Sequence, residues 1–91
     1  MKIGDFLNAH VLRLELASSN DGYFTAVVKT PTGGKPKFLS YGDRTFISCF
    51  GSGKTPNLAL KNLCEDLSGR TMVLTSQGKR KEIEVPSTLV V

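Results

Sequence analysis

The chain has 91 residues, of which 40% are hydrophobic and 22% are charged. This length supports one modest core, so we expect a single domain over residues 1–91 with its core at about 10–87. No apolar run approaches the roughly 18 residues of a membrane span, and the first residues lack the pattern of a signal peptide. Two cysteines and no CxxC motif indicate reduced thiols, so we expect a cytoplasmic protein without membrane contact.

The charge balance gives a first hint of function. Twelve Lys and Arg against eight Asp and Glu leave a net charge of +4, which favours an acidic partner such as nucleic acid or an acidic protein face. The candidate residues for binding nucleic acid or a partner are the clustered basic ones: Lys35, Lys37, Arg44, Lys54, Lys79, Arg80 and Lys81. The alternative is that these charges lie on solvated turns.

The first half of the chain predicts strands. Residues 10–17 alternate between apolar and polar side chains, which indicates a half-buried strand. A turn at 18–22 then leads into a second strand at 23–30, antiparallel to the first. Two prolines and two glycines make 31–36 a loop. Residues 38–50 are typical of a further strand or hairpin, with a bulged single strand as the alternative.

One helix is clearly signalled. Thr55 is a suitable N-cap, Pro56 fits the first helical position, and Gly69 ends the helix. Its apolar stripe consists of Leu60, Leu63, Cys64 and Leu67.

Two more strands are expected after the helix, at 71–75 and 80–85, before a tail at 89–91 that is either docked or frayed. The predicted order is β-β-β-α-β(β). The fold class is therefore α+β: an antiparallel β-meander with one amphipathic helix packed on one face.

No motif supports catalysis. The run Gly53-Lys54-Thr55 lacks the glycine that a phosphate-binding loop needs at position 48, which is Ser48. A flexible strand-to-helix loop at 51–53 is the simpler interpretation. His10 has no catalytic partner placed by a motif, and the two cysteines are typical of small core residues. We therefore predict a protein that is not an enzyme and holds no cofactor or metal.

The helix carries a family resemblance. Residues 53–67 are similar to the G-x-T-x-x-x-A-L-x-N-x-x-E-x-L signature of HicB-like proteins. Asp21-Gly22-Tyr23 resembles that family's D-G-x-Y turn, and residues 83–87 resemble its I-x-x-P-S strand end. The resemblance implies a partial RNase-H-like or dsRBD-like fold and an antitoxin that sequesters a small RNA-cleaving toxin. The longer segment at 29–42 and the lack of a C-terminal DNA-binding segment depart from the family pattern.

Double-stranded-RNA-binding domains offer a second resemblance. Their G-x-G-x-S-K-K-x-A-K frame is matched by Gly51, Gly53, Thr55 and Ala59. The lysines that hold phosphate in that frame are replaced here by Pro56, Asn57 and Leu60. The opening helix of those domains is also missing from the predicted elements, so we do not expect RNA recognition by this face.

Three functional hypotheses follow. The leading one is a non-catalytic binding module, a HicB-like antitoxin or an inhibitory accessory protein of phage or mobile-element type. Such a module sequesters another protein, either toxin-like or a host factor, in the cytoplasm (the host's, if a phage encodes it). The first alternative is a basic, sequence-nonspecific nucleic-acid-binding protein that works through phosphate contacts. The second is a structural oligomer joined through sheet edges, and a homodimer or higher oligomer is expected through the N-terminal strand, whose only charges are Arg13 and Glu15.

Overall fold

The computed structural model describes residues 1–19, 21–31, 36–39, 46–76 and 78–91. Within these ranges the elements are α1 (Ile3–Ala9), β1 (Arg13–Ser18), β2 (Phe24–Lys29), β3 (Lys37–Leu39), β4 (Phe46–Ser48), β5 (Phe50–Gly53), α2 (Pro56–Leu67), β6 (Thr71–Ser76) and β7 (Lys79–Glu84). The predicted α+β class, with antiparallel strands and an amphipathic helix on one face of a sheet, is confirmed.

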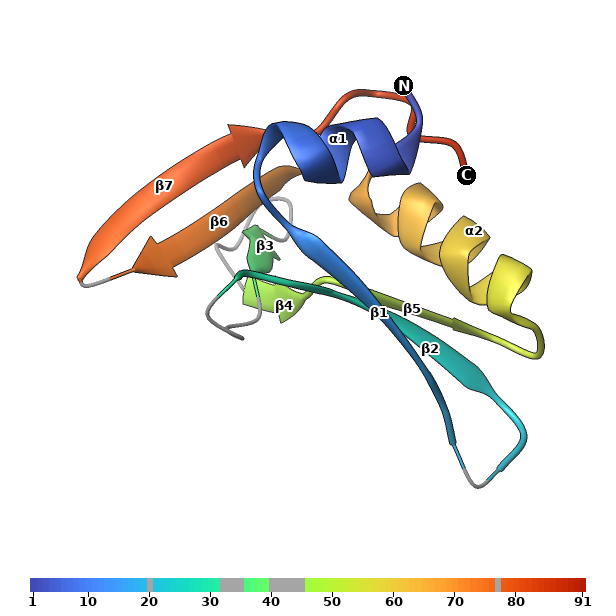
Figure 1. Cartoon of the computed structure of the whole chain (residues 1–91). Coiled ribbons are helices and arrows are strands. Elements are labelled where there is room, and N and C mark those ends of the chain that lie inside the picture. The colour runs from blue at the N-terminus through green and yellow to red at the C-terminus, as the bar shows by residue number, and fades with distance from the viewer. Residues whose placement is uncertain (20, 32–35, 40–45, 77) are drawn as a thin grey trace.

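The described strands divide between two sheets instead of following one meander (Figure 1). One sheet has the order β1-β2-β5, and the other has the order β4-β3-β6-β7. After β2 the chain leaves the first sheet to form β3 and β4 in the second, and it then returns as β5 beside β2. The predicted element at 38–50 therefore overlaps three short strands that belong to two sheets.

The β1–β2 connection is a tight turn, as the sequence predicts. Gly22 has a positive φ of 85°, a conformation that glycine adopts without steric cost. The Ser19 hydroxyl donates to Asp21 Oδ1, and the Ser19 N–H donates to the Tyr23 carbonyl at 2.8 Å. The bond from Ser19, followed by one from the Tyr23 N–H, lowers the pKa of the Asp21 carboxyl below its ordinary value.

Helix α2 begins and ends where the capping signals predict. Thr55 Oγ1 accepts a hydrogen bond from the Leu58 N–H at 3.1 Å, and Pro56 occupies the first helical position. At the other end, Ser68 donates its N–H to the Cys64 carbonyl, and Gly69 follows with a φ of 74°. The predicted helix is confirmed.

Helix α2 packs unusually close to β5 because β5 carries glycines. A Cβ on Gly51 would lie 2.3 Å from the Leu63 backbone nitrogen, and one on Gly53 would lie 2.6 Å from the Leu58 Cβ. The prediction that residues 51–53 form a flexible loop is wrong: they pair with β2 as a strand. Their glycines make room for the helix and do not serve as a hinge.

The core joins both sheets and both helices. Its least exposed members from the first sheet and α2 are Ala26, Val28, Ala59, Leu63 and Leu67, each at 0% exposure. Met72 and Ile83 extend the core into the second sheet. The described residues include no buried polar or charged side chain, so apolar burial dominates the packing.

Helix α1 lies outside the predicted elements, and the expectation of no opening helix is wrong. Ile3, Phe6 and Leu7 are buried on one side of it, at helical spacing. The C-terminal tail holds this helix in place, since the Ile3 N–H donates to the Val90 carbonyl at 2.8 Å and Leu89 is buried. Of the two alternatives for the tail, the docked one is correct.

Candidate functional site

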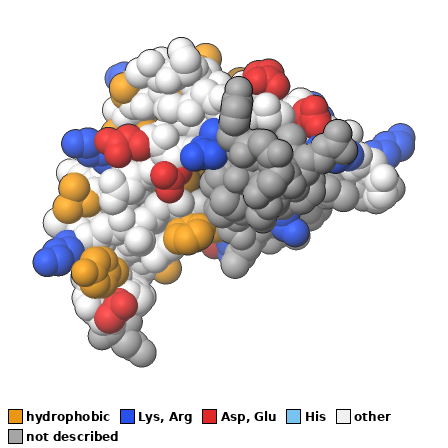
Figure 2. All heavy atoms as spheres, turned by 180° about the vertical axis from the view of Figure 1, so that it is seen from behind, with side chains coloured by type: hydrophobic (Ala, Val, Ile, Leu, Met, Phe, Trp, Pro, Cys, Tyr) orange, Lys and Arg blue, Asp and Glu red, His pale blue; other side chains and the backbone are white. Residues whose placement is uncertain are grey.

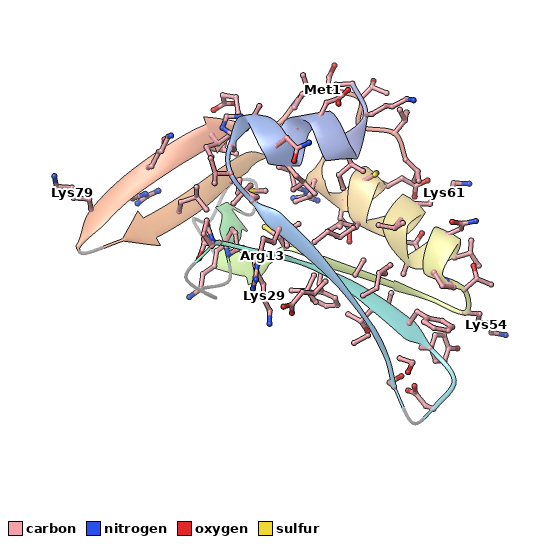
Figure 3. All side chains as sticks on the ribbon, viewed as in Figure 1. Met1, Arg13, Lys29, Lys54, Lys61 and Lys79 are labelled. Carbon is pink, nitrogen blue, oxygen red and sulfur yellow. The ribbon has the colours of Figure 1, made fainter. Side chains whose placement is uncertain are left out.

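The basic residues singled out by the sequence do not gather into one patch. Lys54 and Lys79 lie at opposite ends of the molecule (Figure 3). Lys37 is exposed on β3 in the second sheet. Lys35 and Arg44 lie outside the described residues.

The basic triplet on β7 is divided between the two faces of its hairpin. Lys79 and Lys81 alternate with Arg80, so they lie on the face opposite to it. Arg80 shares its face with Glu82, and its guanidinium Nη2 lies 2.9 Å from Glu82 Oε1. One carboxylate therefore offsets the charge of Arg80, and only the lysine pair forms an unmixed basic spot on this hairpin.

Charges are mixed on another part of the surface as well. Figure 2 shows basic and acidic side chains interspersed on the face that it draws. Lys37 lies opposite Val73, which in turn lies opposite Glu82. A broad electropositive surface, as duplex nucleic acid needs, is not formed by the described residues.

The residues weighed for catalysis are occupied in packing. Cys49 is 1% exposed, and its burial raises the pKa of its thiol to about 12. Burial, with a smaller effect of Glu65, also raises the pKa of Cys64. His10 caps the end of α1 with its ring 4.9 Å from that of Phe6.

In the described part of the chain, no three His, Cys, Asp or Glu side chains group as metal ligands would. No helix in that part is long and apolar enough to cross a bilayer.

The face of the first sheet that lies opposite to α2 carries the strongest candidate surface. Because Gly51 and Gly53 turn their Cα hydrogens toward α2, the alternating residue Phe50 points to the other face. Val27 lies directly opposite Phe50, and Glu15 lies opposite Val27, so the three share this outer face. Phe50 is 44% exposed, so nearly half of its surface is open to solvent on this face.

An ion-pair cluster borders these apolar side chains. The Lys29 Nζ lies 2.6 Å from Glu15 Oε2, and the Arg13 Nη2 lies 3.5 Å from Glu15 Oε1. Both cations come from the same end of the β1–β2 pair, where Arg13 and Lys29 lie opposite each other (Figure 3). We call Arg13, Glu15, Val27, Lys29 and Phe50 the outer patch.

The amino-acid sequence alone does not indicate this patch as a site. Alternation along the first predicted strand already places Arg13 and Glu15 on one polar face. Phe50 carried no comparable signal, because its direction depends on the glycines after it packing against α2. The outer patch is thus a product of tertiary structure.

Comparison of the chain with protein-family models, curated proteins and solved structures found no match. The HicB-like resemblance therefore rests on the sequence motifs alone and stays a prediction.

Proposed function

We propose that this protein is a non-catalytic binding module, of the antitoxin or inhibitory type, that holds a protein partner on the outer patch. The observation that carries the proposal is Phe50, 44% exposed beside Val27 on the sheet face that α2 does not cover. A large aromatic side chain kept in water costs free energy that a bound partner recovers by covering it.

The make-up of the outer patch suits a protein better than a nucleic acid. Protein interfaces place an aromatic anchor at the centre and charged groups at the rim. Phe50 and Val27 provide such a centre, and the Arg13–Glu15–Lys29 cluster provides a rim of both signs. The HicB-like motifs in α2 and at the β1–β2 turn support the proposal that the protein acts like an antitoxin when it holds its partner.

Nucleic-acid binding is the second candidate, and it depends on Lys79 and Lys81. Both side chains are exposed on one face of β7 near the end of its hairpin. Two lysines permit only weak binding through phosphates without base selection. We therefore rank this function below a protein partner.

Co-expression with the product of the neighbouring gene tests the proposal. We expect a stable complex, and we expect Phe50→Ser to weaken it about 30-fold, as for loss of an anchor worth about 2 kcal/mol. Leu58→Ser is the matched control, since Leu58 is also 44% exposed but belongs to α2 on the other side of the sheet.

Titration calorimetry on the purified pair gives the affinities, and thermal melting verifies that each variant is folded. Equal loss with Phe50→Ser and Leu58→Ser, or no loss with either, would contradict the outer patch as the binding surface.

A further inference from the structure

The outer edge of β1 has the features of a self-pairing strand. The Val28 N–H donates to the Cys49 carbonyl on the β5 side, so the backbone groups of Val28 point away from β1. Alternation then directs Val27 and Lys29 toward β1, where they lie opposite Glu15 and Arg13. The N–H and C=O groups of Leu14, Leu16 and Ser18 consequently point to the outer edge, which no strand in the described ranges covers.

This edge lacks the protection seen on the other sheet. Five of the six residues of β7 are charged, which discourages edge-to-edge pairing. β1 has only two charged residues, and both lie on the outer face, where Glu15 is paired with Lys29. On the opposite face Leu16 is 46% exposed, beyond the reach of α2, which packs over β5 and β2.

We propose that a second copy of this chain pairs with this edge, antiparallel and centred on Leu16. The dimer joins two three-stranded sheets into one continuous sheet with both α2 helices on the same face. A two-fold axis through Leu16 sets Leu16 opposite itself, Glu15 opposite Ala17 of the second copy, and Leu14 opposite Ser18 of the second copy.

Charge and backbone direction disfavour the registers that are shifted toward the start of β1. Shifting the centre to Glu15 would set two like carboxylates directly opposite each other, which is unfavourable. Shifting it to Leu14 would bring the turn at 10–12, with Val11 at a φ of 54°, against the second copy's strand. A register shifted by a single residue would set a residue whose backbone groups point to the outer edge opposite one whose backbone groups point to β2, so the two strands could not form hydrogen bonds.

Leu16 lies on the face of the sheet opposite to the outer patch, so a substitution of Leu16 tests the dimer without changing an outer-patch residue. Sedimentation of the full chain over a concentration series is the first experiment. We expect a species of twice 9.9 kDa. Leu16→Lys, which sets two ammonium groups opposite each other, should raise the dissociation constant at least about tenfold.

Leu58→Lys is the control, because it alters an equally exposed leucine away from the edge and should leave the dimer intact. A monomer at every concentration, or equal weakening by Leu16→Lys and Leu58→Lys, would overturn the proposal.

Cross-linking tests the register. Residues that face each other in a hydrogen-bonded antiparallel pair have Cα atoms about 5.5 Å apart, within disulfide range. Leu16→Cys should therefore form a covalent dimer under mild oxidation, whereas Ser18→Cys should not, because position 18 faces Leu14 of the second copy. Both native cysteines are buried, which keeps the background low. Equal cross-linking of both variants, or none with Leu16→Cys, would refute a dimer centred on Leu16.

Discussion

Val11 is the only described residue other than glycine with a positive φ, at 54°. It joins α1 to β1 in a turn closed by the Leu12 N–H, which donates to the Leu7 carbonyl at 2.8 Å. A left-handed backbone costs an ordinary residue about 1–2 kcal/mol, and a β-branched side chain is especially ill-suited to it. The Val11 side chain is 68% exposed and so recovers little of this cost through packing.

Val11→Gly should therefore raise the free energy of unfolding by about 1 kcal/mol, because glycine adopts this conformation without strain. Urea denaturation measures the change. Val11→Ala loses the branch but retains a Cβ, so it should give a smaller gain than Val11→Gly. A less stable glycine variant would show that the turn is not strained.

Gly51 is the opposite case, because α2 leaves no room for a side chain at this position. Gly51→Ala would place a methyl group 2.3 Å from the Leu63 backbone nitrogen and 2.6 Å from the Ala59 carbonyl oxygen. We expect a loss of about 3 kcal/mol in stability, since backbone on both sides leaves little room for relaxation. Gly4→Ala, with nothing within 4 Å, should cost nothing in the same thermal melts, and equal effects of the two changes would refute the close packing of α2 on β5.

Among the elements, α2 contributes most to the core, and Leu63 is its central residue at 0% exposure. Leu63→Ala should destabilise the protein by about 2–5 kcal/mol through lost burial and the cavity left behind. Chemical denaturation checks the value. Leu58→Ala on the exposed side of the same helix should cost far less, and a parent-like midpoint for Leu63→Ala would contradict the packing of α2.

The elements differ in how well the sequence predicts them, and the cause is whether their signals are local. The cap at Thr55, the proline after it and the terminal Gly69 lie in or beside α2, so its bounds were predictable. The strand at 50–53 was not predictable, because its glycines make room for a helix that follows them in the chain. For α1 a local signal existed in the spacing of Ile3, Phe6 and Leu7, but seven residues give it little weight.

At the scale of the whole molecule, the distribution of charge limits nucleic-acid binding. If Lys79 and Lys81 contact two phosphates of a duplex, log affinity should fall with log salt at a slope of about −1.8. Converting both to alanine should abolish that slope, while Arg80→Ala, which removes a cation already paired with Glu82, should change it little. Fluorescence titration at several salt concentrations measures this, and a steeper or sequence-selective response would favour the nucleic-acid function over a protein partner.

The candidate surfaces illustrate the same limit on prediction at this scale. The sequence places Lys79, Arg80 and Lys81 next to one another, but strand alternation separates them onto two faces. Conversely, Phe50 and Glu15 are distant in the chain, and only the β1-β2-β5 order brings them to one face. Proximity in the sequence therefore suggested the basic triplet as a site, although the strand places its side chains on two faces. It did not indicate the outer patch, whose residues only the sheet brings together.

The docking of the tail beside α1 brings the two ends of the chain together. The Val90 N–H donates to the Met1 carbonyl at 3.0 Å, and the Met1 ammonium group donates to the Thr88 carbonyl at 3.2 Å. A short peptide joining residues 91 and 1 would thus close the backbone into a ring without displacing any element. If such a ring were opened between β1 and β2, the elements would keep their places in the fold but follow one another in a different order along the chain.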